Sequence, residues 1–375
     1  MAFREINSWH MNSNTSYINR EHSIWVKGIL SILIVLGHDM VFTIPLQEYG
    51  VMSFLYMFHI QVFFILPFLY GIDNHSYTKE RLKNTIIRFF WPYLLLVTLF
   101  VVGYNIVTLF SHFSIRGLFR LYVFCDGITI RQMCGVQIFW FLPSMMCTVL
   151  LKELYYRSRA WIKCLLFVLS FIFIGFAIYS RVSYSTYDSW SHIMRNIPLG
   201  GGYAINMLAL GVITRWFFSQ MVLHKRYVQT AFVGTICFIV CSILYWHYVA
   251  DFMSRKPFNV LYTILQQVAP VTFIAALVAY INLLGIKRRG YISEFGKYSL
   301  LIYLISPFVG YVCAFVAIKL HLMYWWMGLL IWPLIVLVSY RIAIWIGTTK
   351  FSNILIPQNA DVLQSACKKV KEKYF

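Results

Sequence analysis

The chain carries little charge, and very little of that charge is negative. Only 12% of its 375 residues are charged, and 13 Asp and Glu residues stand against 32 Lys and Arg residues. With 60% hydrophobic residues, it has more apolar surface than a soluble protein of this length could bury. The apolar residues come in long runs and do not alternate with polar ones. This pattern predicts an all-α fold, a polytopic transmembrane helical bundle.

Cysteine motifs and linkers are also absent. The eight cysteines form no CxxC pair and no zinc-type spacing, so we expect no metal. Cys125 and Cys134 share a segment predicted to lie outside the membrane, where they could form a disulfide. We expect no cleavable signal peptide, because the first apolar run starts about twenty residues into the chain and is too long for one. That run should act as a signal anchor.

Ten membrane spans are predicted from the apolar runs, and each is long enough to cross a hydrocarbon core of about 30 Å. They cover roughly residues 24–44, 51–71, 87–110, 134–151, 162–180, 198–218, 229–249, 259–283, 298–318 and 325–347. The transmembrane domain thus takes up residues 24–347. It lies between an N-terminal tail, residues 1–23, and a basic tail, residues 348–375. From Asp361 onward this tail is expected to form a short basic helix at the inner leaflet, as a topology anchor in preference to a binding element.

The basic residues set the orientation of these spans. With the N-terminus in the cytoplasm, 24 of the 32 Lys and Arg residues fall on the cytoplasmic side. Because short cytoplasmic loops are enriched in positive residues, both termini are predicted to be cytoplasmic. Scattered in this way, the net charge of +19 does not indicate nucleic-acid binding. The expected surroundings are a lipid bilayer.

Lys27 and His38 are the two costly residues of the first apolar run, IWVKGILSILIVLGHDMVF (24–42). The eleven helical steps between them, at about 100° each, return to within about 20° of the starting direction. Both side chains therefore project from one face, roughly 16 Å apart along the axis. A cation at the membrane edge and an imidazole at mid-depth suit an anionic cofactor whose reactive end reaches inward.

Other candidates lie nearby. His59 falls in the middle of the second run, and Arg88 opens the third. An imidazole at mid-bilayer can simply donate to a backbone carbonyl, but two in consecutive spans favour a functional role. Lys79, Arg81 and Lys83, with Arg88, form a basic cluster that fits either positive-inside topology or the binding of a phosphate-rich ligand.

Asp39 follows His38 directly. Side chains at neighbouring helical positions do not face each other, so Asp39 is not expected to orient the imidazole. Pairing with another helix and contact with a polar substrate are both open roles for Asp39.

The first motif, WVKGILSILIVLGHDM (25–40), resembles the first span of the membrane acyltransferase 3 family. There, a basic residue, ten residues and a histidine form the hallmark, and most members carry arginine at the position of Lys27. Four further motifs resemble the family in its order: FLYMFHIQVFFILPFLYG (54–71), IIRFFWPYLL (86–95), IFWFLPSMM (138–146) and ISEFGKYSLLIYLISP (292–307). The form of the first motif suggests the branch that acetylates fucose-like and other surface sugars.

Two positions depart from the family's pattern. Pro67-Phe68 stands where Ser-Gly is common, and Ser306 stands where the late Ile-Tyr element often ends in histidine.

The resemblance implies a sugar or polysaccharide O-acetyltransferase in a bacterial cytoplasmic membrane. Its donor would be cytoplasmic acyl-CoA, most often acetyl-CoA, and its acceptor a hydroxyl of a cell-surface glycan or lipid-linked sugar. Lys27, with Arg81, Lys83 or Arg88, would hold the CoA phosphates. His38 would act as general base, or would itself be acylated, and His59 could assist or polarise the carbonyl oxygen.

Two other classes remain open. One is a transporter or flippase of glycans or lipid-linked sugars, which would also use buried polar residues and helix breaks. The other is a purely structural subunit of a glycan assembly complex. Binding of acyl-CoA separates the enzyme from both.

Overall fold

The computed structural model describes residues 17–46, 50–71, 79–183, 196–249, 256–285, 290–349, 352–357 and 359–374. The regular elements of these residues are all helical, which confirms the predicted fold class. The longer helices are α1 (Arg20–His38), α5 (Lys79–Val107), α8 (Phe141–Arg157), α9 (Ala160–Ser183), α11 (Gly201–Leu223), α12 (Tyr227–Leu244), α13 (Lys256–Leu283), α15 (Ser299–Lys319), α16 (Trp325–Thr348) and α18 (Ala360–Tyr374). The shorter ones that matter below are α2 (Met40–Thr43), α3 (Val51–Tyr56), α4 (His59–Ile65), η2 (Leu66–Leu69), α6 (Ile115–Phe119), η3 (Arg120–Phe124), α7 (Gly127–Cys134), α14 (Tyr291–Lys297) and α17 (Ser352–Leu355).

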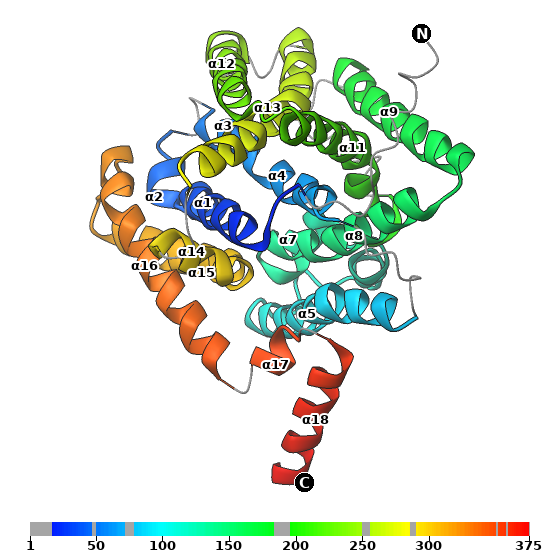
Figure 1. Cartoon of the computed structure of the whole chain (residues 1–375). Coiled ribbons are helices and arrows are strands. Elements are labelled where there is room, and N and C mark those ends of the chain that lie inside the picture. The colour runs from blue at the N-terminus through cyan, green and yellow to red at the C-terminus, as the bar shows by residue number, and fades with distance from the viewer. Residues whose placement is uncertain are drawn as a thin grey trace, which may run out of the picture.

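Within the described residues, nine helical segments are long and apolar enough to cross a membrane. The helix of the first predicted span, α1, is not among the nine. It still runs for 19 residues through the bundle, in contact with α4, α13, α14 and α15. Figure 1 shows α4 near the centre of the molecule, and α1, α11 and α13 pack against it.

The third predicted span starts too late in the sequence. We predicted a span from 87 to 110, with Lys79, Arg81 and Lys83 in the loop before it, but α5 begins at Lys79. The residues KERLKN are good helix formers, so the helix extends past the apolar run. The basic residues therefore lie on the first turns of a helix and not in a loop.

The first two spans are both broken beside a histidine. α1 ends at His38, and Asp39, in an extended conformation, caps the short α2. The second span is interrupted at Met57 and Phe58, so that His59 opens α4. Breaks of this kind are tolerated inside a bundle, where neighbouring helices surround the freed backbone groups.

α14, which follows the described end of α13, packs very closely against α1. A Cβ added to Gly28 would overlap the carbonyl oxygen of Ile292, and one added to Gly296 would overlap that of Ile24. Only glycine allows the two backbones to approach this closely, as at many interfaces between membrane helices. The first and the last of the sequence motifs are thus in direct contact.

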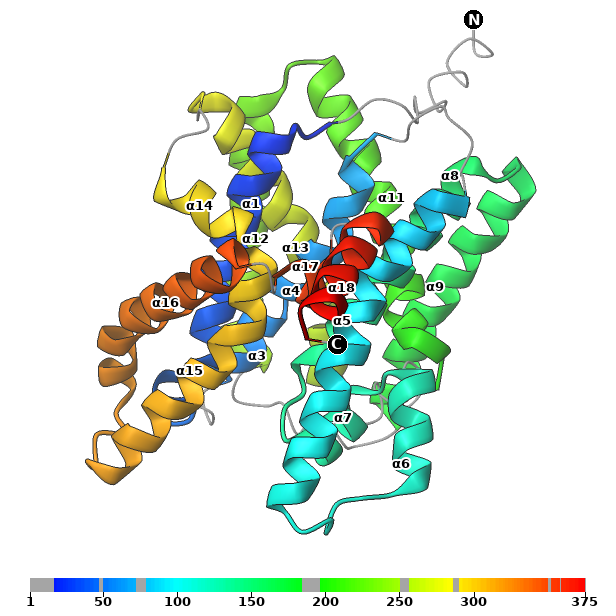
Figure 2. The same ribbon diagram turned by 90° about the horizontal axis from the view of Figure 1, so that it is seen from below.

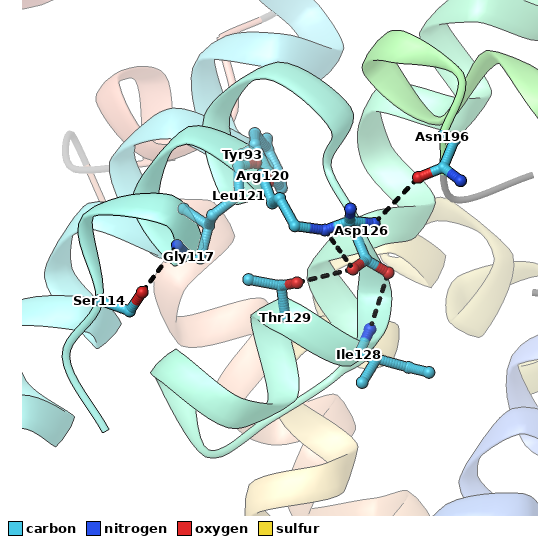
Figure 3. Close-up of polar contacts among 9 residues, drawn as sticks. All are labelled: Tyr93, Ser114, Gly117, Arg120, Leu121, Asp126, Ile128, Thr129 and Asn196. Carbon is cyan, nitrogen blue, oxygen red and sulfur yellow. Dashed lines mark hydrogen bonds and ion pairs between the residues drawn. The ribbon is translucent and has the colours of Figure 1, made fainter. Parts of the chain in front are cut away.

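The segment between α5 and α8, predicted as the longest external one, is folded on the end of the bundle. Asp126 caps α7 by accepting from the backbone N–H of Ile128, at 3.3 Å, and from the hydroxyl of Thr129, at 2.6 Å. Arg120 lies 3.5 Å from the same carboxylate and donates to Asn196, as Figure 3 shows. This network joins the segment to the chain before α11.

Candidate active site

The inner end of α1 gathers positive charge. Lys27 is half-buried, and Arg20 and Arg88 are close enough for their charges to repel that of Lys27. No carboxylate pairs with Lys27 or Arg88 in the part of the chain that the structure describes. Adjacent cations without a counter-charge are unfavourable at the edge of a low-dielectric region. Their arrangement suits an anionic ligand.

Two hydroxyl groups lie beside these cations. Tyr70, at the end of the second span, donates to the hydroxyl oxygen of the buried Ser23, and its phenol is close to Arg20 and Arg88. The segment is held from the other side by the buried Arg215, which donates to the carbonyl oxygens of Phe68, at 2.6 Å, and of Tyr70, at 2.8 Å. A cation suits these C-terminal carbonyl groups of a helix. Arg215 thereby fixes the place of Tyr70.

The basic residues on α5 that were predicted to bind phosphate are not equivalent. Arg88 is exposed and lies near Lys27. Arg81, seven residues earlier, falls on the same face of α5, whereas Lys83 is turned by about 140° from Arg88 and is exposed. The structure therefore brings Arg88 to Lys27, continues that face with Arg81, and directs Lys83 elsewhere.

At the outer end of α1, His38 meets a residue that the sequence marked only as a departure from a pattern. Its Nδ1 lies 3.3 Å from Oγ of Ser306 on α15. When Nδ1 donates to this oxygen, Nε2 of the neutral imidazole carries the lone pair that a general base needs. Ser306 is completely buried, so it is fixed in place.

His59 is almost completely buried and lies close enough to His38 for the two imidazoles to interact electrostatically. Its Nδ1 donates to the carbonyl oxygen of Leu55, which is the structural role considered above as the alternative to function. This bond places the hydrogen on Nδ1 and leaves Nε2 as an acceptor in the neutral ring. A neutral His59 can therefore receive a proton but cannot donate from Nε2 to a carbonyl oxygen.

Aromatic residues surround the outer end of α1. The ring centroid of Tyr303 lies 6.1 Å from that of His38 and 4.9 Å from that of Phe141. The Tyr303 hydroxyl donates to the carbonyl oxygen of Ile138, at 2.8 Å, and so connects this end to the chain that follows α7. These rings cover one side of the half-buried imidazole and so reduce its contact with water.

Asp39, predicted to contact substrate, is a completely buried helix cap. Its Oδ1 accepts from the backbone N–H groups of Val41, at 3.0 Å, and Phe42, at 3.3 Å. The other carboxylate oxygen has no hydrogen-bond partner among the residues that the structure describes. Asp39 thus ends α1 directly after His38, which sets the depth of the imidazole.

Cys125 and Cys134 are free and buried, so the disulfide considered above is not formed. Burial raises the pKa of the Cys125 thiol to about 12, which keeps it protonated and unreactive. Among the described residues, no group of three or more His, Cys, Asp or Glu side chains could hold a metal ion.

Sequence reasoning missed Ser306, Tyr70 and Tyr303 as members of the site. Tyr303 and Ser306 are three residues apart, so they share a helix face, but nothing in the sequence says that this face meets His38. Tyr70 carried no signal at all.

Comparisons with known proteins identify no family for the chain. No family model, no curated protein and no solved structure matches the chain.

Proposed function

We propose that the protein is an integral-membrane O-acyltransferase, as the resemblance to the acyltransferase 3 family implies. It would move an acyl group from cytoplasmic acyl-CoA to a hydroxyl of an extracytoplasmic glycan or lipid-linked sugar. One observation carries this proposal. The helix α1 joins two groups of polar side chains: near its inner end Lys27 lies beside Arg88 of α5 with no carboxylate partner among the described residues, and at its other end the half-buried His38 lies close to the buried His59 of α4.

The donor would enter from the inner end of α1. Lys27 and Arg88 would bind the phosphate groups of CoA, since ammonium and guanidinium groups form charge-assisted hydrogen bonds with phosphate oxygens. Arg81 extends the same face of α5 toward the end of the helix. The pantetheine arm would follow α1 over the roughly 16 Å between Lys27 and His38.

The transfer step would take place at His38. Its Nε2 removes the proton of the acceptor hydroxyl while that oxygen attacks the carbonyl carbon of the thioester. The carbon–sulfur bond then breaks, and the imidazolium returns its proton to the sulfur of CoA. Ser306 would hold Nδ1 throughout, and the second imidazole, His59, could receive a proton at Nε2. Direct acylation of His38 followed by transfer to the sugar gives the same products.

The experiment is to measure the binding and hydrolysis of acetyl-CoA and succinyl-CoA by the purified protein in detergent. We expect saturable binding and slow hydrolysis without an acceptor, because water can replace the sugar hydroxyl. The absence of binding and turnover with both donors would contradict the proposal.

The helix breaks favour a second candidate function, a transporter or flippase of glycans or lipid-linked sugars. α1 and α2 are separated at Asp39, and α3 and α4 at Met57 and Phe58, both beside buried polar residues. Transporters place such breaks at their substrate site. Uptake of a lipid-linked sugar by proteoliposomes, without any binding of acyl-CoA, would support this candidate.

A further inference from the structure

The last helix, α18, lies outside the bundle. It runs for 15 residues, from Ala360 to Tyr374, and its main contacts are with α17 and with α5. Figure 1, a view along the bundle, shows α18 extending sideways away from the other helices, and Figure 2 shows it in front of α5. A spanning helix would run with the bundle, so α18 is not a span.

The connection to α5 sets the level of α18 relative to the membrane. Asn84 accepts from the backbone N–H of Ala360 through its side-chain oxygen, at 3.0 Å. About two turns further along α5, Trp91 donates to the carbonyl oxygen of Ile354, at 2.7 Å. Tryptophan is typical of the interface between lipid and water. α18 therefore leaves the bundle at the level where the charged end of α5 meets the headgroups.

The residues of α18 divide into two faces. In helical register Val362, Leu363 and Ala366 share one side, and all three are half-buried. The other side carries Asp361, Gln364 and Ser365, which are exposed.

Four lysines fall in the second half of α18: Lys368, Lys369, Lys371 and Lys373. Among the charged residues from 361 to 375, only Asp361 and Glu372 oppose them. A basic helix that leaves a membrane bundle at this level is typical of elements that bind an anionic membrane surface.

We propose that α18 lies in the headgroup region of the leaflet on the side of the chain termini and binds anionic phospholipids. The first half of α18 would stay beside α17 and α5, and the lysines of its second half would contact the lipid phosphates. The sideways direction, the level of Asn84 and Trp91, and the distribution of charge all agree with this placement. The inference is independent of the acyltransferase proposal.

The test uses the full-length protein with an environment-sensitive fluorophore on Cys367. Cys367 is exposed on α18, and the other accessible or half-buried cysteines (Cys147, Cys164, Cys237 and Cys313) are replaced by alanine. The labelled protein is placed in nanodiscs of phosphatidylcholine alone or with phosphatidylglycerol. Quenching by lipids that carry a quencher in the acyl chain then reports how deep α18 lies.

We expect stronger quenching in the phosphatidylglycerol discs, and a loss of that difference at 1 M salt, where the Debye length falls to about 3 Å. Replacing the lysines of α18 by glutamine should reduce the docked fraction by about fivefold for each lysine, whereas Glu372→Gln should increase it. The control is the double variant Lys225→Gln/Arg226→Gln. Both residues are exposed on the same side, between α11 and α12, and their replacement should leave the quenching unchanged. Equal quenching in both lipid compositions, or quenching that the α18 lysines do not affect, would overturn the proposal.

Discussion

The two ends of α1 differ in how their polar side chains are satisfied. At the inner end, Lys27 and Arg88 lie near each other with no carboxylate partner among the described residues. At the outer end, Nδ1 of His38 and Nδ1 of His59 each have a partner, Ser306 and the carbonyl group of Leu55. The cations at the inner end thus have no counter-charge among the described residues, whereas each imidazole at the outer end has a partner for its Nδ1 atom.

This difference indicates a division of labour along one helix. A site for binding charge needs cations that no carboxylate of the protein neutralises. A site for moving a proton needs an imidazole of fixed orientation with one nitrogen unoccupied. Variants at the two ends should therefore change different quantities, the donor affinity at one and the turnover rate at the other.

His38→Ala should have the largest effect. Loss of a general base lowers the rate by about 100- to 10,000-fold, so transfer and hydrolysis of acyl-CoA should both become undetectable or nearly so. The affinity for the donor should stay within a factor of about two. Turnover is measured with purified protein, and the unfolding temperature confirms that the variant is folded. His224→Ala, at an exposed histidine after α11, is the matched control. Full turnover in His38→Ala would refute the assignment.

Lys27→Ala should weaken donor binding by about 10- to 100-fold, the value of a charge-assisted hydrogen bond of about 1.5–3 kcal/mol. Arg88→Ala should act in the same direction. Both effects are measured as changes in the dissociation constant of acetyl-CoA. Lys225→Ala, at an exposed lysine on the same side, is the control. An unchanged dissociation constant in both variants would remove the cation cluster from the donor site.

Gly296→Leu tests whether the inner end depends on the close packing of α14. The new side chain would overlap the carbonyl group of Ile24, and overpacking of this kind costs about 1–3 kcal/mol. We expect a lower unfolding temperature and weaker donor binding, because α1 must shift beside Lys27. Gly175→Leu, on the exposed side of α9 with no atom within 4 Å, is the control and should leave both quantities unchanged. Similar behaviour of the two variants would argue against the tight contact.

Ser306→Ala should have the smallest effect. Without the hydroxyl, Nδ1 of His38 loses its partner, and the rate should fall by about two- to tenfold while the donor affinity stays the same. Ser306→Thr keeps a hydroxyl and should restore most of the rate. If Ser306→Ala and Ser306→Thr are equally active, the bond to His38 has no role in turnover.

The helical class and most spans could be predicted from the sequence, because long apolar runs have few other structures available in a membrane. The start of α5 could not, since KERLKN is polar yet helical, and hydropathy registers only its polarity. The breaks at Asp39 and at Met57–Phe58 also gave no hydropathy signal. They depend on which neighbouring helices surround the freed backbone groups.

The site could be predicted only along a single helix. The spacing of Lys27 and His38 fixes a common face by helix geometry alone. Ser306 lies 268 residues from His38 in the chain, and only the packing of α15 on α1 brings them together. For Asp39, the chemistry suggested a substrate contact or a pairing with another helix, and its additional role as a helix cap depends on a break in the backbone that the sequence did not predict.

The division of labour is tested most directly with two donors, acetyl-CoA and acetyl-pantetheine, of which only the first carries phosphate groups, together with the adenosine that bears them. The quantity to compare is the ratio of kcat/KM for the two donors in the wild type, in Lys27→Ala and in His38→Ala with its residual activity. We predict a strong preference for acetyl-CoA in the wild type, a loss of most of that preference in Lys27→Ala, and its retention in His38→Ala. The same preference in the wild type and Lys27→Ala would contradict the account, because the inner end of α1 would then not bind the phosphates.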